Sequence, residues 1–64
     1  KKLVVELNEN ERKVYGYLKD KEKQLFDVIS LETQIPVCQL SSILLQMELK
    51  GVIKPLPGKV FSIL

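Results

Sequence analysis

The sequence lacks most of the residue types that build metal sites and catalytic sites. Its 64 residues include no histidine, no tryptophan and only one cysteine, Cys38. One cysteine without histidine cannot complete the four-ligand shell of a structural zinc site, and it cannot form a disulfide within the chain. The sequence also has no glycine-rich phosphate loop and no pair of carboxylates in an apolar setting. We therefore expect a protein that is not an enzyme, with no catalytic residue, no metal and no cofactor.

Long apolar runs are absent as well. No segment is apolar over the roughly 20 residues that a membrane-spanning helix needs, and the first residues show no signal-peptide pattern. A chain of 64 residues makes one small domain. Such a domain buries only about 60% of the surface that its unfolded chain exposes. Because the sequence begins at Lys1 rather than at a methionine, we expect it to be one domain of a longer protein.

An excess of positive charge is also missing. Ten basic residues stand against eight acidic ones, which gives a net charge of +2 and a pI near 8.8. A domain dedicated to duplex DNA is usually more basic, with a pI above about 9. Seven of the ten basic residues lie within the first 24 residues, and the remaining forty residues are neutral, with three lysines against three acids. Charge therefore gives little support to strong DNA binding.

The C-terminal third of the chain predicts a helix with a defined end. Apolar residues recur at helical spacing between Val37 and Lys50, at Leu40, Ile43, Leu44 and Met47. This spacing gives a helix one apolar stripe. Lys50 suits the negative end of the helix dipole, and Gly51 can adopt the left-handed conformation that ends many helices. Apolar segments then flank the turn pair Pro57-Gly58, which predicts a hairpin of two short strands.

A first helix is predicted from Glu9 to Leu18. Asn8 precedes it, and Glu11 follows Asn8 by three residues. This spacing resembles a capping box, in which each side chain binds the other residue's backbone N–H. The apolar face of the helix is formed by Val14, Tyr17 and Leu18.

The middle of the chain predicts a loop and a second helix. Residues 19–24 are mostly charged and are expected in a solvated loop, after which Leu25 and Phe26 could add a short strand. Asp27 is a good N-cap for a helix over residues 28–33.

Together these elements predict a mainly α fold with a small β-hairpin. Two helices joined by a short turn at residues 33–36, followed by a hairpin, are typical of a winged helix-turn-helix with three helices and a wing. We expect residues 7–64 to form this domain and residues 1–6 to be the end of a linker or a short edge strand. The residues expected to be buried together are Val14, Leu18, Ile29, Ile35, Leu40, Leu44, Met47, Val52 and Phe61.

The segment over residues 44–61 resembles a known family. Its E-L-K-G at residues 48–51 and L-P-G at residues 56–58, followed by Phe61, are similar to the C-terminal winged-helix domain of the DNA-processing protein DprA, also called Smf. Residues 7–18 and 33–37 resemble the same family's first helix and turn. The resemblance therefore covers residues 7–61.

Three departures from the family pattern concern the turn and the wing. Gln34 stands where a helix-turn-helix often has glycine, and Lys59 stands where the family often has a second glycine. Ile63 and Leu64 replace an end that is typically basic. These differences bear on DNA contact by the wing more than on the fold.

The resemblance implies a role in DNA processing. Proteins of this family bind and protect incoming single-stranded DNA during natural transformation and help to load the bacterial recombinase. Their main work is done by a Rossmann-like domain that this sequence does not contain. The resemblance therefore implies an accessory role for the winged helix in a bacterial, cytoplasmic protein, and it transfers no site residue.

Helix-turn-helix geometry predicts one set of residues for DNA contact. Glutamine can read adenine edges, serine can reach phosphates, and lysines at the helix end and wing can neutralise phosphates. No lysine or arginine lies on the groove-facing part of the third helix, so we expect any binding to be weak and salt-sensitive. The lysines could equally serve solubility alone. The candidates are Gln39, Ser42, Gln46, Lys50, Lys54 and Lys59.

Protein recognition is the alternative that the sequence favours slightly. Val37, Leu45 and Leu49 are apolar residues expected on the outer surface of the third helix. They suit a charge-depleted contact with other domains of the parent protein, a second copy or a recombination protein. A helix register shifted by one residue would instead bury Leu45 or Leu49. Cys38 is expected to be a small, half-buried residue, with a reactive thiol at the helix N-terminus as the alternative.

Overall fold

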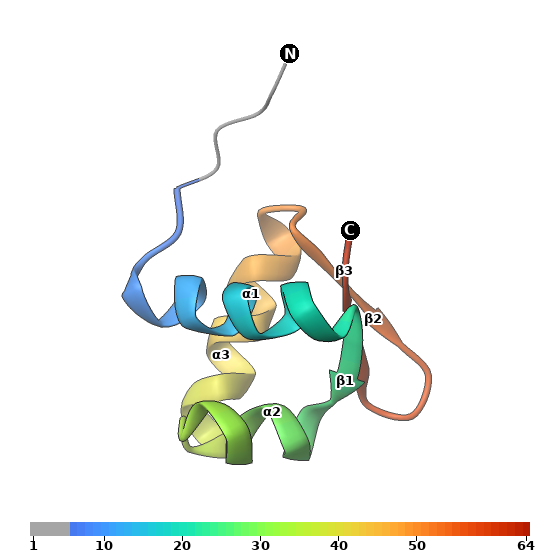
Figure 1. The fold of residues 1–64 in the computed structure, drawn as a ribbon. Helices are drawn as coiled ribbons and strands as arrows, with labels where there is room; N and C mark the ends of the chain where they lie inside the picture. Colours follow the sequence, from blue (N-terminus) through green and yellow to red (C-terminus); the bar gives the residue numbers. More distant parts are fainter. Residues whose placement is uncertain (1–5) are drawn as a thin grey trace.

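The computed structural model describes residues 6–64. It contains three helices and three short strands, arranged so that one antiparallel sheet lies beside the helices (Figure 1). This confirms the predicted winged helix. The expected linker or edge strand at residues 1–6 falls almost wholly outside the described residues. The elements are α1 (Glu9–Lys21), β1 (Lys23–Leu25), α2 (Phe26–Thr33), α3 (Val37–Leu49), β2 (Ile53–Leu56) and β3 (Val60–Ile63).

Helix α1 begins with the predicted capping box. The Glu11 N–H donates to Asn8 Oδ1 at 2.8 Å, and the Asn8 N–H donates to Glu11 Oε1 at 3.0 Å. The helix continues to Lys21, so the loop predicted over residues 19–24 is wrong. No glycine or proline interrupts that stretch, and Lys19 and Lys21 suit the negative end of the helix dipole.

The sheet has the strand order β1-β3-β2, with both pairings antiparallel. Strand β1 includes Leu25, and α2 starts at once with Phe26, two residues earlier than predicted. Asp27 therefore lies in the first turn rather than at the N-cap. The reason is a contact with a distant segment: the Phe26 N–H donates to the Lys59 carbonyl at 2.8 Å, so the wing satisfies an amide that a cap would otherwise have to satisfy.

The turn between α2 and α3 is fixed by side-chain hydrogen bonds. Gln34 has a φ of 62°, the left-handed conformation that allows the sharp change of direction. The Ser30 hydroxyl donates to the Ile35 carbonyl, and the Thr33 hydroxyl donates to the Ile29 carbonyl, each at 2.6 Å. Helix α3 thus leaves α2 at a defined angle.

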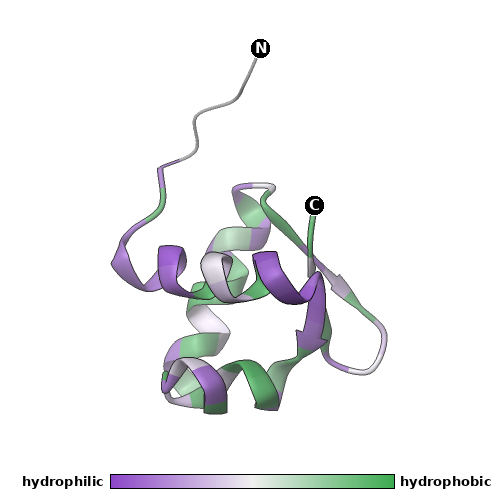
Figure 2. Cartoon of the chain, in the orientation of Figure 1, coloured by the Kyte–Doolittle hydropathy of each residue, from purple (hydrophilic) through white to green (hydrophobic). Residues whose placement is uncertain are grey.

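The core lies between the three helices and the inner side of the sheet. Seven of the nine residues expected to be buried are buried. Val52 and Phe61 are only half-buried and pack against the edge of the core. Val52 precedes β2, and Ile53, the first residue of that strand, is buried in its place. Figure 2 shows hydrophilic residues concentrated on α1 and β1 and hydrophobic residues along α2 and α3. The core residues are Val14, Leu18, Ile29, Ile35, Leu40, Ile43, Leu44, Met47 and Ile53.

No single helix within residues 6–64 is long and apolar enough to cross a membrane. Helices α2 and α3 meet that test by length and composition only when counted as one span, and they are bent by 110° at their junction.

Candidate functional site

Helix α3 presents two apolar faces. Its inner face packs into the core, and Leu44 is 1% exposed, whereas the next residue, Leu45, is 54% exposed. Leu45 belongs to an outward stripe of four exposed residues, Cys38, Ser42, Leu45 and Leu49, spaced at i, i+4, i+7 and i+11. This spacing places all four on one side of a helix. Leu49 is 72% exposed, so the predicted helix register is correct.

The exposed surface of α3 carries no charge over most of its length. No acidic or basic residue occurs between Val37 and Met47. The candidate DNA-contact residues Gln39, Ser42 and Gln46 are exposed on this surface, as is Val37. Their side chains offer hydrogen bonds and apolar contact but no charge neutralisation, so the surface is chemically suited to contact rather than to catalysis.

Cys38 is fully part of the exposed stripe. The expectation of a half-buried residue is wrong, because Cys38 points away from the core side of α3. The sulfur therefore belongs to the exposed stripe of α3.

The two wing lysines lie apart from the α3 stripe. Lys54 is exposed on β2, opposite Ser62 of β3, and Lys59 is exposed in the turn that joins β2 to β3. Lys59 has a φ of 59°.

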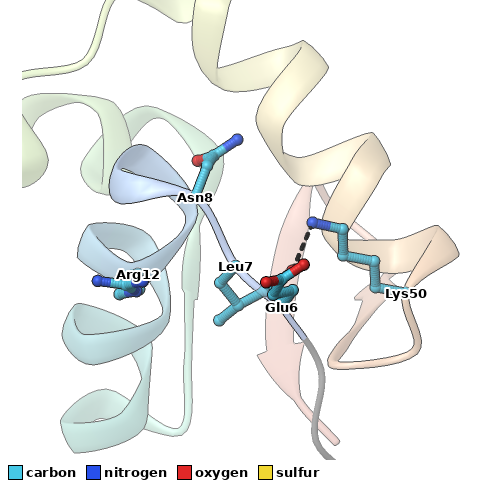
Figure 3. A pocket seen from close by; sticks show the side chains of 5 residues that line it. All are labelled: Glu6, Leu7, Asn8, Arg12 and Lys50. Atoms are coloured by element: carbon cyan, nitrogen blue, oxygen red, sulfur yellow. Dashed lines mark hydrogen bonds between the residues drawn. The ribbon is translucent and has the colours of Figure 1, made fainter.

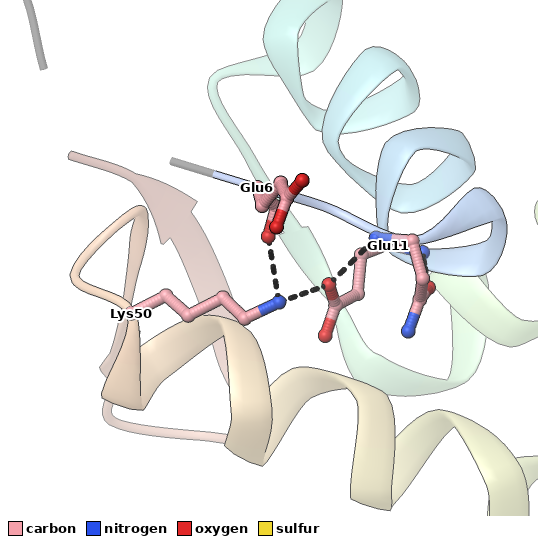
Figure 4. Close-up of polar contacts among 4 residues, drawn as sticks. Glu6, Glu11 and Lys50 are labelled. Carbon is pink, nitrogen blue, oxygen red and sulfur yellow. Dashed lines mark hydrogen bonds and ion pairs between the residues drawn. The ribbon is translucent and has the colours of Figure 1, made fainter. Parts of the chain in front are cut away.

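Lys50 has a different environment from the wing lysines. Its Nζ donates to Glu11 Oε1 at 2.6 Å and to the Glu6 carbonyl at 2.8 Å (Figure 4). Its side chain is about one third exposed, whereas Glu11 is buried. The contact joins the end of α3 to the start of α1. Sequence reasoning missed this ion pair because its partners are 39 residues apart.

The electrostatics of Glu11 follow from this contact. Burial alone would raise the pKa of Glu11, but the hydrogen bonds from Lys50 and the Asn8 N–H, with the attraction of the Lys50 charge, outweigh burial. The pKa of Glu11 is therefore lowered. A shallow depression beside the pair is lined by Glu6, Leu7, Asn8, Arg12 and Lys50 (Figure 3). Its polar groups are largely those of the capping box and the ion pair, which gives this region a structural role.

A second hollow lies where α2, α3 and the wing meet. It is lined by Phe26, Ser41, Lys59 and Phe61. The two phenylalanine rings have their centroids 6.3 Å apart and are tilted by 51°. Sequence reasoning assigned Phe61 to the core and Phe26 to a possible strand, and it did not bring the two rings together. The signal available was weak, because only the β1–β3 pairing places them side by side.

Comparison with known proteins gives one match. A family model described as the DprA winged helix domain matches residues 4–59 of the 64-residue chain. This span includes α1, α2, α3, β1, β2 and the turn of the wing. No curated protein and no solved structure matches the chain.

Proposed function

The chain belongs to the family of DprA winged helix domains, and from this premise we propose that it is a protein-association module that docks through the outward stripe of α3. The observation that carries the proposal is the exposure of Leu45 and Leu49 on a helix that carries no charge between Val37 and Met47, Glu48 being the one charged residue of α3. Charge depletion around exposed apolar residues is the compositional signal of an interface centre. Two large apolar side chains on one stripe are more than the scattered surface leucines of an ordinary domain.

The same residues argue against a DNA-reading helix. Phosphate neutralisation by lysine and arginine supplies most non-specific DNA affinity. The α3 surface has neither residue type before its C-terminal end, and Lys50 at that end is already bound to Glu11. Using Lys50 for phosphate would leave a buried carboxylate without its partner, which is costly.

The partner that we propose for the stripe is a second copy of this chain. The stripe is small at one end, with Cys38 and Ser42, and large at the other, with Leu45 and Leu49. When two such helices lie antiparallel, Leu45 of each copy faces Ser42 of the other, and Leu49 faces Cys38. Each large side chain then meets a small one, the arrangement that fills a helix–helix interface evenly. The four residues of the stripe are uncharged, so no like charges meet within the contact.

In the parent protein this contact would bring copies of a DNA-processing protein together. As the resemblance implies, we propose that the parent acts on incoming single-stranded DNA and assists recombinase loading in the bacterial cytoplasm. The winged helix contributes assembly rather than the DNA site. Docking onto another domain of the parent or onto a recombination protein becomes the role to test for the stripe if the chain does not self-associate in the experiment below.

The test is sedimentation of the chain at rising concentration. One helix stripe buries an area at or below the low end of specific interfaces, so concentrations up to about 1 mM are needed. We expect reversible association that Leu45→Glu abolishes, because the carboxylate would be buried without a partner. Leu31→Glu is the matched control, since Leu31 is an exposed leucine on α2. Circular dichroism verifies that both variants remain folded.

Two results would count against the proposal. A wild-type chain that stays monomeric throughout the range removes the second copy as partner. Equal weakening by Leu31→Glu and Leu45→Glu shows that association does not depend on the stripe.

Weak DNA binding through the wing is the second candidate function. It is favoured by the exposure of Lys54 and Lys59 on the wing. Two phosphate contacts give only non-specific affinity, in the range of about 10⁻⁴–10⁻⁶ M. Replacing both lysines by alanine should lower the affinity for labelled DNA and flatten its salt dependence. Tight binding that prefers one sequence would contradict this account.

A further inference from the structure

The hollow between α2, α3 and the wing combines an apolar floor with one positive charge. Phe26 and Phe61 are half-buried and packed against the core, and the exposed parts of their side chains form the floor of the hollow. Ser41 of α3 and Lys59 of the wing also line the hollow, and their side chains carry a hydroxyl and an ammonium group. Neither the family nor the α3 stripe accounts for these four residues together.

The hollow is held in shape by backbone contacts. The Phe26 N–H donates to the Lys59 carbonyl at 2.8 Å, which fastens the tip of the wing to the start of α2. The pairing of β1 with β3 sets Gln24 opposite Phe61 and so fixes the two aromatic residues beside each other. A ligand would therefore meet a largely preformed site.

Lys59 occupies a backbone position where glycine has the lower energy. Its φ of 59° is left-handed, and a side chain there is strained. Residues held in a strained backbone conformation are often found at functional sites. In this structure Lys59 is one of the four residues that line the aromatic hollow.

We propose that this hollow binds a protein segment in which one bulky apolar side chain is flanked by acidic residues. The apolar side chain packs on the exposed edges of Phe26 and Phe61, whose rings already contact each other, and a carboxylate pairs with the Lys59 ammonium. The Ser41 hydroxyl donates a hydrogen bond to a backbone carbonyl of the segment. The Lys59 charge alone would attract any anion, and the apolar floor alone would accept any apolar group. Together they favour a ligand that carries both a carboxylate and an apolar side chain.

A nucleic-acid strand fits the hollow less well. Bases bind to aromatic side chains that offer an open flat face, and a groove of several cations must follow the phosphates. Here both rings are half-buried and tilted by 51° against each other. Lys59 is the one cation among the residues that line the hollow.

The inference goes beyond the proposed association through the α3 stripe and does not depend on it. The stripe residues Leu45 and Leu49 do not line the hollow. Peptide binding can therefore be measured on the Leu45→Glu variant, in which association through the stripe is abolished and the residues of the hollow are unchanged.

The experiment titrates the full chain with a short fluorescent peptide in which one phenylalanine is flanked by aspartates. We expect saturable binding and chemical-shift changes at Phe26, Ser41 and Phe61 in nuclear magnetic resonance spectra. Replacing the peptide phenylalanine by alanine should weaken binding about tenfold or more, as expected for loss of one buried aromatic side chain. Replacing the aspartates by asparagines should weaken it by a smaller factor.

Lys59→Gly separates binding from folding. Glycine relieves the left-handed strain, so the variant should melt no lower than the wild type, yet it should bind the peptide about two- to fivefold less tightly, the range for one exposed ion pair. Lys54→Gln, which removes a wing charge outside the hollow, is the matched control and should bind normally. The proposal is overturned if the peptide causes no shifts in the hollow, if Lys59→Gly binds as well as the wild type, or if a thymidine oligonucleotide binds there and the peptide does not.

Discussion

Two consecutive leucines of α3 belong to different regions of the molecule. Leu44 is 1% exposed on the inner face, and Leu45 is 54% exposed on the outer stripe. Each residue turns a helix by roughly 100°, so neighbours with the same side chain have unrelated surroundings. The inner face builds the core that any winged helix needs. The outer face of α3 has no lysine or arginine, the residue types that neutralise phosphates in DNA-reading helices, and this is the basis of the proposed association.

The two faces also differ in what their apolar residues contribute to folding. A domain of 64 residues has little apolar surface to spare. Leucines on the inner face stabilise the fold, whereas Leu45 and Leu49 remain largely in contact with water. The association proposed for the stripe would remove these two side chains from water.

The largest expected effect tests this difference directly. Leu44→Ala should destabilise the domain by about 2–5 kcal/mol, because it removes buried methyl groups and leaves a cavity. Leu45→Ala should change stability by no more than about 0.5 kcal/mol, as is usual for exposed positions. Denaturant unfolding of both variants at a concentration where the chain is monomeric measures the two values. Similar losses for the two substitutions would refute the assignment of the two faces.

A second prediction concerns the polar contact at the end of the inner face. Lys50→Ala should destabilise the domain by about 1–3 kcal/mol, the range for loss of a hydrogen bond to a buried charged group, because the Asn8 N–H then remains as the partner of Glu11 Oε1 without a cation. That charged group is the buried Glu11 carboxylate. Lys54→Ala removes the same charge from an exposed strand position and serves as control. If the two variants are equally stable, Lys50 is a surface lysine like the others.

The sequence predicted the architecture well, because its signals are local. The capping box at Asn8, the helical spacing of Leu40, Leu44 and Met47, and the turn at Pro57-Gly58 each act over a few residues. The helix register of α3, and with it the exposure of Leu45, was correct for the same reason.

The errors arose where distant segments meet. Strand β1 and the early start of α2 depend on hydrogen bonds to β3 and Lys59, which no local pattern reports. The Glu11–Lys50 pair and the Phe26–Phe61 hollow likewise join residues far apart in the chain. The candidate binding residues could be nominated from the sequence, but not the contact that occupies Lys50.

A third prediction uses pH to isolate the Glu11 contact. Since the pKa of Glu11 is lowered in the folded state, its contribution to stability is present above its unfolded pKa of about 4.3. That contribution is lost as the pH falls below about 4.3 and through the folded pKa. Because other carboxylates titrate in the same range, the informative quantity is the difference between wild type and Glu11→Gln. This difference should be constant near neutral pH and shrink in acid, and a difference that is independent of pH would contradict the account.

The smallest expected effect concerns the turn that sets the angle of both faces. Gln34 has a φ of 62°, and a left-handed conformation costs a residue with a side chain about 1–2 kcal/mol. Gln34→Gly removes that cost, but glycine also gains about 0.4–1 kcal/mol of conformational freedom in the unfolded chain. The two terms nearly cancel, so we expect a gain in stability between zero and about 1 kcal/mol. Thermal unfolding measures it, and Gln39→Gly, which places glycine inside α3, should instead lower stability by about 1 kcal/mol. A clear loss for Gln34→Gly would mean that the Gln34 side chain itself positions α3, and that the orientation of the outer stripe depends on it.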